Sequence, residues 1–413
     1  MVKLQLRKDS KPIFFKEREV PYALRERVEK ELDELESSAI ISKIDRSDWG
    51  SPLVVLPKAD NNVRLCVDYK PGVNSQLVSS NYPIRKIQEI SDNLKGSKYF
   101  CRLDLYKAYL HLKVCEESSI IQTISTHRGT YKFNRLSFGI KTAPSEFNRI
   151  IEQILCGLQK TMSYFDDIII HGSTLEECKF NLVQCLQRLH DHDLHLNVNK
   201  CEFFKTEIVY LGHVIRYNQI LKDPNKVEAI LKMQRPSSAD DVKRFLGMVT
   251  YYSRFIKNLS TITAPLRQLL TKNKKFDWSS QCEAAFIKLK LIMSSDEVLM
   301  PFDPSLPIRV ACDASPTGIA GILSHVVNNV ERPVAYASRS LSTAEKNYSQ
   351  LDREALAIVF AINYFFLYVY GRKFQLVTDN RSLTRYFHER NHMPAKTSRR
   401  LLWYVEFLVG IRL

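Results

Sequence analysis

The stretch MSYFDDIIIHG, residues 162–172, constrains the fold more than any other part of this 413-residue chain. Two adjacent aspartates, Asp166 and Asp167, stand between runs of apolar residues that favour β-strands. This pattern predicts a tight hairpin within a buried sheet. Because aspartate is a common turn residue, a solvated turn is the simplest interpretation. A metal site is the alternative, since two neighbouring carboxylates repel each other until a cation neutralises them.

Residues on both sides of the hairpin predict a sheet with helices on one face. Segments with apolar residues at helical spacing alternate with short apolar runs bounded by turn residues. The predicted elements up to residue 220 are a helix within 19–42, two strands within 51–69 around a turn at Asp60–Asn62, a strand over 97–105, a helix over 142–158, the hairpin over 164–172, a helix over 174–194 and strands within 202–220. This order fits a mixed or antiparallel sheet in an α+β fold.

The sequence changes in character near residue 222. A helical region follows, with helix N-caps predicted at Ser238 and Ser280 because an acidic residue stands three positions after each. The proline-containing stretch MPFDPSLP marks a domain boundary near residue 300. Beyond it, a smaller α/β domain is predicted, with strands over 308–315, 318–326, 331–341 and 374–379 and an apolar helix over 355–371.

Composition limits the environment and the partners. The 60 Lys and Arg against 45 Asp and Glu give a net charge of +15, which favours a polyanionic partner such as nucleic acid. The nine cysteines have neither a C-x-x-C pair nor zinc spacing, so we expect reduced thiols. The N-terminus lacks a signal-peptide core, and the longest apolar run, 355–371, is too short to span a membrane. We therefore expect a soluble intracellular protein, cytoplasmic or nuclear, with no membrane partner.

Asp104 brings a third carboxylate toward the hairpin. It ends the strand predicted over 97–105, which can pair beside the strands that carry Asp166 and Asp167. Three carboxylates at adjacent strand ends form a cluster of hard oxygen ligands that suits Mg²⁺. Two such ions about 3.5–4 Å apart would stabilise both the attacking and the leaving oxygen of a phosphoryl transfer.

Six motifs in order make the chain resemble the reverse transcriptase and ribonuclease H segment of a gypsy-type LTR-retrotransposon Pol polyprotein, over nearly its full length. The motifs are SPLVVLPKADNNVRLCVDY, RLDLYKAYLHL, FNRLSFGIKTAPSEF, YFDD, LNVNKCEFFKTEIVYLGHVI and FLGMVTYYSRFIKNLSTITAPLRQLL. The resemblance implies a right-hand polymerase followed by a ribonuclease H-like α/β domain. Its parts would be fingers and N-terminal palm over 1–95, a palm with a ferredoxin-like sheet and the catalytic motifs over 96–220, a helical thumb or connection over 221–300, and the ribonuclease H-like domain over 301–413.

The implied activity is RNA-directed DNA polymerisation. Such an enzyme adds dNTPs to a DNA primer on an RNA template, with two Mg²⁺ ions per active site or Mn²⁺ in their place, and works in the cytoplasm, within a retroelement particle, or in the nucleus. Asp104, Asp166 and Asp167 would hold the polymerase metals together with the backbone carbonyl of Leu105. Among the other residues, Lys58 and Arg64 would clamp the triphosphate, Tyr109 would exclude the ribose 2′-OH, Phe138 and Gly139 would contact nucleotide and template, Lys200 would protonate the leaving pyrophosphate, and Tyr164, Phe165 and Gly212 would contact primer or template.

A second acidic set matches the ribonuclease H arrangement. Asp313, Glu354 and Asp379 would bind two Mg²⁺ ions and hydrolyse the RNA strand of an RNA–DNA hybrid. Taken alone, Glu354 would be an ordinary acid near a helix N-terminus. The sequence stops at VEFLVGIRL, before the family's last acidic ligand, so we expect ribonuclease H activity to be slow or absent.

The chain also departs from the family within its motifs. Lys70–Gly72 replaces a basic-x-Leu-Asn pattern, Ser137 stands where proline is common, Phe165 is bulky for its position, and Asn380 replaces a frequent histidine. We expect a reshaped finger loop and altered fidelity or speed. These departures leave an alternative function open, a catalytically inactive nucleic-acid-binding remnant of a retrotransposon.

Overall fold

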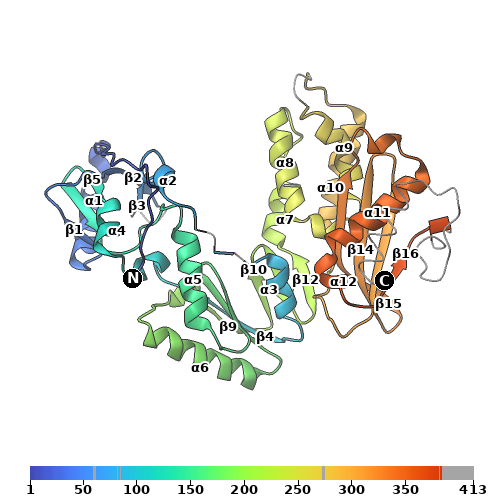
Figure 1. The fold of residues 1–413 in the computed structure, drawn as a ribbon, viewed down its shortest axis with the longest axis horizontal. Helices are drawn as coiled ribbons and strands as arrows, with labels where there is room; N and C mark the ends of the chain where they lie inside the picture. The colour runs from blue at the N-terminus through green and yellow to red at the C-terminus, as the bar shows by residue number, and fades with distance from the viewer. Residues whose placement is uncertain (59–61, 81, 84, 272–274, 381, 384–413) are drawn as a thin grey trace. The chain divides into compact units, whose positions relative to one another are not determined.

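A computed structural model describes residues 1–58, 62–80, 82–83, 85–271, 275–380 and 382–383. The chain divides into two compact units (Figure 1). Unit 1 comprises Met1–Lys86 and Lys98–Thr206, and unit 2 comprises Ile87–Ser97 and the described residues from Glu207 onward. The finer division into fingers, palm, thumb and ribonuclease H-like parts stays a prediction.

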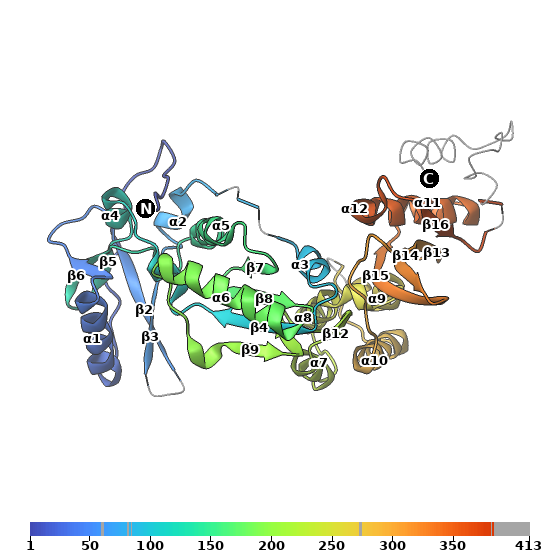
Figure 2. The ribbon, with the colours of Figure 1, turned by 90° about the horizontal axis from the view of Figure 1, so that it is seen from below.

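The central sheet of unit 1 is the antiparallel sheet that the sequence predicted. Its strands lie in the order β7-β8-β4-β9, and helices α5 and α6 contact each other and pack on it (Figure 2). The chain order β4, α5, β7, β8, α6, β9 is that of a ferredoxin-like fold. The bounds are β4 Tyr99–Asp104, α5 Ala143–Leu155, β7 Thr161–Tyr164, β8 Asp167–Gly172, α6 Leu175–Asp191 and β9 Glu202–Lys205.

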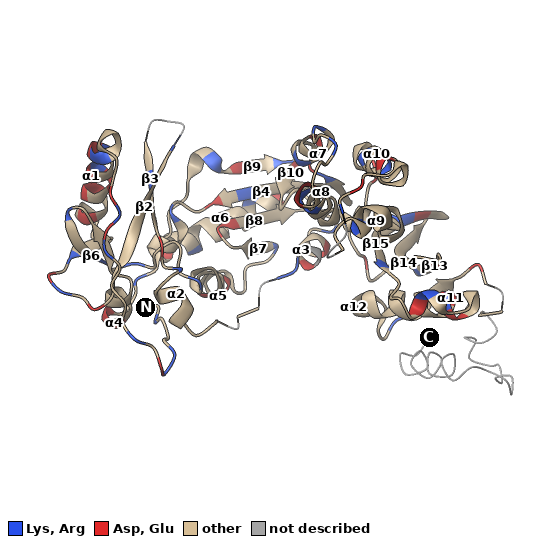
Figure 3. Ribbon diagram, turned by 90° about the horizontal axis from the view of Figure 1, so that it is seen from above, with Lys and Arg blue, Asp and Glu red and all other residues tan. Residues whose placement is uncertain are grey.

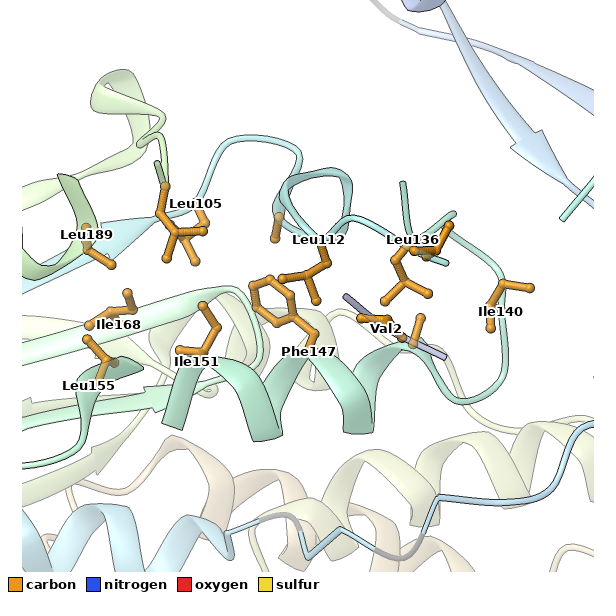
Figure 4. Packing of buried hydrophobic residues seen from close by; sticks show 14 of the residues in the cluster. Val2, Leu105, Leu112, Leu136, Ile140, Phe147, Ile151, Leu155, Ile168 and Leu189 are labelled. Atoms are coloured by element: carbon orange, nitrogen blue, oxygen red, sulfur yellow. The ribbon is translucent and has the colours of Figure 1, made fainter. Parts of the chain in front are cut away.

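The core beneath this sheet explains why its strands are so apolar. Ile168, Ile169 and Ile170 of β8 are all fully buried, as expected for a central strand covered on both faces. Phe147 and Ile151 project from α5 toward the strands (Figure 4). Burial of such large side chains contributes roughly 1.5–3 kcal/mol each, so the catalytic candidates stand at the ends of well-anchored strands.

A second sheet in unit 1 has the strand order β1-β6-β5-β2-β3. Helix α1 packs against β3, with Val28 and Leu32 fully buried. The predicted helix within 19–42 is shorter in the structure, since Ala39 adopts a left-handed φ of 52° and the chain turns into β1. Sequence reasoning assigned no elements to 116–133, and Asp60 and Asn61 of the predicted turn lie outside the described residues. The bounds are α1 Tyr22–Ser37, β1 Ile41–Lys43, β2 Ser51–Pro57, β3 Val63–Val67, α2 Val73–Gln76, η1 Ala108–His111, α4 Glu116–Ile121, β5 Ile124–Thr126, β6 Gly129–Phe133 and η2 Val198–Lys200.

Unit 2 begins with a three-stranded antiparallel sheet and a set of helices that share one core. The cap predicted at Ser238 is confirmed, since its side chain accepts a hydrogen bond from the Asp241 N–H. The cap predicted at Ser280 is wrong by one residue: Ser279 accepts from the Cys282 N–H, and Ser280 is the first helical residue. The bounds are α3 Ile87–Asn93, β10 Glu207–Tyr210, β11 His213–Arg216, β12 Gln219–Lys222, α7 Pro224–Leu231, α8 Ala239–Tyr251, η3 Ser253–Phe255, α9 Leu259–Gln268 and α10 Ser280–Ser294.

The rest of unit 2 is the predicted α/β domain. Its sheet has the order β15-β14-β13-β16, with β13 parallel to β16, and α11 packs on β13 and β14 (Figure 1). The apolar helix starts earlier than predicted, because Ser349 caps it by accepting from the Asp352 N–H, and it breaks at Phe365. The bounds are β13 Ile308–Ala314, β14 Gly318–Val327, β15 Val330–Ser340, η4 Glu345–Asn347, α11 Gln350–Tyr364, α12 Phe366–Val369 and β16 Phe374–Val377. Within the described residues, no helix is both long enough and apolar enough to span a membrane.

Candidate active sites

The aspartate pair lies in a two-residue hairpin turn. Tyr164 and Asp167 are paired in the β7–β8 ladder, so Phe165 and Asp166 form the turn between them. Phe165 has a left-handed φ of 55°, which an L-residue with a bulky side chain rarely adopts. Its ring packs edge-on against Tyr164, with centroids 4.7 Å apart. The residue that is unusual in the sequence therefore also holds a strained conformation, and the turn leaves Asp166 exposed.

Asp104 lies directly opposite Asp167 across the β4–β8 pair, as the sequence predicted. The two strands continue to align beyond it, because the Leu105 N–H donates to the Asp166 carbonyl at 3.2 Å. Burial raises the pKa of Asp167; Arg102 and Lys200 counteract that rise, and Asp104 and Asp166 add to it. The structure thus brings three carboxylates from two strands and a turn into electrostatic contact.

A cavity of about 400 Å³ opens beside these carboxylates in unit 1. Its lining contains two of the three aspartates, Asp104 and Asp166, together with Leu105. Three predicted cations line it as well: Lys58 and Arg64, expected to clamp the triphosphate, and Lys200, expected to protonate the leaving pyrophosphate. All three cations are exposed, so their charges are free to meet an anion. Residues far apart in the sequence therefore converge on one cavity, as the motif roles require.

Tyr109 and Phe138 form an aromatic pair at this site. Their ring centroids are 5.0 Å apart, and Tyr109 also packs edge-on against Phe147 at 5.2 Å. Burial and the charge of Asp166 raise the pKa of Tyr109 to about 12, so its hydroxyl stays neutral. Phe138 lines the cavity, whereas Tyr109 is not among its lining residues.

Gly139 has a structural reason to be glycine. Its φ is +94°, and a Cβ there would meet the Val67 carbonyl oxygen at 2.9 Å. The turn is fixed by Asn74, whose amide donates to the Gly139 carbonyl and accepts from the Lys141 N–H, both at 2.8 Å. Sequence reasoning missed Asn74, although it stands in helix α2 only two residues after the departing segment Lys70–Gly72.

Ser137 makes a bond that proline could not. Its N–H donates to Oε1 of Gln122 at 2.8 Å, and both residues are buried. Proline has no N–H, so this chain fixes the segment before Phe138 by a hydrogen bond in place of a rigid ring. Gln122 is a second residue that no motif signalled.

Gly212 lies in unit 2, in the turn between β10 and β11. It has a φ of +66°, and the Tyr252 hydroxyl donates to its carbonyl at 2.7 Å. A Cβ at this position would meet Nζ of Lys226 at 2.6 Å. The glycine is therefore required by its backbone conformation and by its neighbours within unit 2, and its predicted contact with primer or template stays a prediction.

The second acidic set gathers at one end of the ribonuclease H-like sheet. Asp313 lies near the end of β13, and Asp379 follows the parallel strand β16 by two residues. Glu354 is in α11, which packs on the same sheet, and is only 3% exposed. Burial together with Asp379 and Asp313 raises the pKa of Glu354 to about 7.

One oxygen of Glu354 lacks a protein partner. Gln350 donates to Oε1 at 2.6 Å, whereas Oε2 is buried and has no hydrogen-bond partner among the described residues. Buried carboxylate oxygens are usually hydrogen-bonded or bound to a cation. This oxygen fits a metal ligand.

Asn258 is a residue near this site that the sequence did not signal. It precedes α9 with a left-handed φ of 54°, and its Nδ2 donates to Oδ2 of Asp313 at 3.1 Å. Thr261 in the first turn of α9 also contacts Ser315, with hydroxyls 3.0 Å apart. The start of α9 is thus fixed to the strand end that carries Asp313.

Asn380, which stands where the family often has histidine, accepts a hydrogen bond from the Ser382 N–H at 3.0 Å.

The carboxylates of each site lie near one another but do not form a complete metal-ligand set among the described residues. In the part of the chain that the structure describes, no three His, Cys, Asp or Glu side chains are close enough to complete a ligand set. The donor chemistry at both sites nevertheless suits a divalent cation, since it consists of carboxylate and backbone oxygens.

Two family models match the chain. Residues 56–215 match a model described as reverse transcriptase (RNA-dependent DNA polymerase). Residues 278–376 match one described as an RNase H-like domain found in reverse transcriptase. The two matches contain the first acidic set and, from the second set, Asp313 and Glu354.

Curated relatives cover nearly all of the chain. The Drosophila melanogaster retrovirus-related Pol polyproteins from transposons 412 and opus are 33% and 34% identical over 99% and 94% of it. The Schizosaccharomyces pombe transposon Tf2-3 polyprotein is 30% identical over 80%. The chain spans only 34%, 41% and 25% of these three proteins.

Solved structures show the same fold. The foamy viral protease-reverse transcriptase in complex with dsDNA has a TM-score of 0.85 at 19% identity, over 99% of this chain and 86% of that one. The same viral protein in complex with RNA/DNA hybrid gives a TM-score of 0.78 at 18% identity, over 97% of this chain and 54% of that one. These likenesses confirm the predicted α+β fold class.

Proposed function

Because the chain belongs to the reverse transcriptases of gypsy-type LTR-retrotransposon Pol polyproteins, we propose that it copies RNA into DNA by adding dNTPs to a DNA primer on an RNA template. One observation carries the proposal most directly. Asp104 faces Asp167 across β4 and β8, and Asp166 lies in the adjoining turn. A cavity lined by the three cations with predicted roles toward the nucleotide phosphates opens beside them. An acidic cluster next to a basic cavity is the charge pattern that a metal–triphosphate complex needs.

The metal would be Mg²⁺, held by Asp104 and Asp166 with Asp167 completing the cluster and the Leu105 carbonyl as a further oxygen. When bound, Mg²⁺ would neutralise phosphate charge and make the primer 3′-OH more acidic. Lys58 and Arg64 would hold the triphosphate by charge-assisted hydrogen bonds, and Lys200 would give a proton to the departing pyrophosphate.

The aromatic pair would shape the sugar pocket. Tyr109 is held by Phe138 and Phe147, so its ring cannot swing away without breaking two contacts. A ring fixed in this way would exclude a ribose 2′-OH and so favour dNTPs. Asn74 and Gln122 would keep Phe138 and Gly139 in place against nucleotide and template.

A second activity has its own observation. The buried Glu354 oxygen without a partner, together with Asp313 and Asp379, supports a divalent-metal site that acts on the RNA strand of an RNA–DNA hybrid. Recognition would depend on the A-form shape of the hybrid and on its backbone, which suits the net charge of +15. Binding should therefore weaken steeply with salt.

The test is Mg²⁺-dependent extension of a labelled DNA primer on an RNA template. Asp166→Asn should abolish extension, and Asp193→Asn, a matched change at a side chain that is 88% exposed, should not. If wild type and Asp166→Asn extend equally poorly, the polymerase proposal is wrong. Tight, salt-sensitive hybrid binding that ignores both Mg²⁺ and Asp166→Asn would then identify the inactive nucleic-acid-binding remnant.

A further inference from the structure

Lys107 lies at the proposed nucleotide cavity, and no motif role accounts for it. It lines the cavity together with Asp104, Lys58 and Arg64. It stands directly before η1 with a left-handed φ of 46°. The Leu110 N–H donates to the Lys107 carbonyl at 2.8 Å and helps to hold this conformation. Left-handed backbone is unfavourable for a non-glycine residue, and such strain is concentrated at functional sites.

Glu31 of α1 meets Lys107 at the same cavity. Its Oε1 lies 3.5 Å from Nζ of Lys107, and the two side chains are 27% and 36% exposed. Helix α1 carries charges of both signs along its length (Figure 3), but only Glu31 among its acids lines the cavity. Because the pair is long and reaches solvent, it contributes little stability and is readily broken.

The charges around the cavity make Glu31 unexpected. Four cations line the described wall, namely Lys58, Arg64, Lys107 and Lys200, along with three acids, Glu31, Asp104 and Asp166. The two aspartates have a reason to be acidic, since they would hold metal. Glu31 does not, and its charge would repel an incoming triphosphate. Its contact with Lys107 supplies the missing reason.

We propose that Lys107 is a further triphosphate-binding cation and that Glu31 holds its side chain until a nucleotide displaces the carboxylate. The inference rests on the proposed polymerase function and deepens it. The triphosphate carries more negative charge than one carboxylate and offers several oxygens, so it outcompetes Glu31 for the ammonium group. Glu31 is a competitor for Lys107 and not a ligand of the substrate.

The two residues therefore have opposite expected effects. Lys107→Met should weaken dNTP binding about tenfold, the effect of losing one charge-assisted contact. Glu31→Gln should strengthen it about threefold, because the competitor and a like charge are both removed. If the pair is merely a structural link between α1 and η1, both substitutions should weaken binding alike or leave it unchanged.

The measurement is dNTP affinity in a complex that cannot react. The full chain is assembled with an RNA template and a primer that ends in a dideoxynucleotide, in Mg²⁺, and dNTP is titrated to equilibrium. Lys30→Met is the matched control, since Lys30 lies on α1, is exposed and does not line the cavity. Thermal melting of each variant checks that it is folded.

The outcomes separate this inference from the proposed function. No dNTP binding by the folded wild type would overturn the polymerase proposal itself. Normal wild-type binding with no loss in Lys107→Met, or with a loss in Glu31→Gln, would overturn only the role of this pair. In the double variant, Glu31→Gln should lose most of its effect, because Lys107 is no longer there to be released.

Discussion

Among the described residues, two cations, Arg102 and Lys200, act on the acidic cluster of unit 1, whereas Arg353 alone acts on Glu354 in the ribonuclease H-like domain. Arg102 and Lys200 oppose the rise in the pKa of Asp167 that burial causes. Around Glu354, burial and two aspartates outweigh the charge of Arg353, and the pKa rises to about 7. Asp166 is exposed, whereas Glu354 is 3% exposed and has one oxygen without a hydrogen-bond partner among the described residues.

The contrast shows two ways of keeping carboxylates together without a metal. In unit 1, neighbouring lysine and arginine charges offset the repulsion, and these same charges can later serve a triphosphate. In the second site, protonation of Glu354 offsets it, and the cost of ionisation remains until a cation arrives. The stability of the second site should therefore depend more strongly on pH and on metal.

The largest expected effect is a crossover between the two sites. Asp104→Asn should reduce primer extension at least ~1,000-fold, because losing a metal ligand forfeits several kcal/mol of transition-state stabilisation. It should leave cleavage of an RNA–DNA hybrid at the wild-type level. Asp313→Asn should leave primer extension at the wild-type level and should abolish the hybrid cleavage of the wild type, which we expect to be slow at most. Both activities are measured on one preparation; loss of extension in Asp313→Asn would contradict the independence of the two sites.

Glu354→Gln should remove a pH dependence of stability. The folded pKa of about 7 lies above the ordinary value of 4.5. The neutral carboxyl therefore contributes stability that is present below pH 4.5 and is lost as the pH rises through 7, by roughly 3 kcal/mol in the absence of metal. The variant should have a higher melting temperature than wild type at pH 8 and the same melting temperature at pH 4.5.

The same melting experiment is repeated with Mg²⁺ added. It should raise the melting temperature of wild type at pH 8 by binding the ionised cluster, and raise that of Glu354→Gln less. Asp352→Asn, two residues earlier in the first turn of α11 and only partly buried, is the matched control. Equal pH profiles for wild type and Glu354→Gln would show that the buried acid is offset by something other than protonation.

Much of both sites could be predicted from the sequence. Strand periodicity placed Asp104, Asp166 and Asp167 at strand ends, and the ladder between β4 and β8 confirms their proximity. Family motifs then singled out Lys58, Arg64 and Lys200, which converge on one cavity. Roles assigned to these residues stay predictions, because the structure shows positions and not reactions.

The residues that sequence reasoning missed share a physical cause. Asn74, Gln122 and Asn258 act through hydrogen bonds to residues far away in the chain, 65, 15 and 55 positions distant. Local periodicity carries no signal for such contacts, which exist only after the sheets have formed. Ser279 was missed for a different reason. Two adjacent serines can each cap the helix, and in the structure Ser279 is the N-cap.

Asn258→Ala should moderately weaken Mg²⁺ binding at the second acidic site and should leave the first site unchanged. Its amide fixes Oδ2 of Asp313, so loss of that bond leaves the carboxylate free to rotate. Groups that orient a metal ligand typically contribute about tenfold or more in metal affinity. We expect about tenfold more Mg²⁺ to be needed for Mg²⁺-dependent thermal stabilisation and for any hybrid cleavage that the wild type shows, with primer extension unchanged. Asn258→Asp, which cannot donate this bond and adds a like charge, should be worse; an unaltered Mg²⁺ requirement in both would exclude the positioning role.

The smallest expected effect is that of Asp167→Asn on the pH dependence of stability. This variant tests most directly whether the neighbouring cations offset the acidic cluster. The pKa of Asp167 is raised, so its pH dependence has the same sign as that of Glu354: stability is lost as the pH rises. This pH dependence should be smaller than that of Glu354, since Asp167 is only partly buried and Arg102 and Lys200 oppose the shift. Metal-free melting curves between pH 4 and 8 should therefore nearly coincide for wild type and variant.

Two further variants test the cations themselves. Arg102→Met should make the stability of the protein depend more strongly on pH. Glu202→Gln, which removes the other acid that Arg102 contacts, at 3.4 Å, should not. A dependence as steep as that of Glu354 would mean that the cations do not offset the cluster, and the contrast between the two sites would disappear.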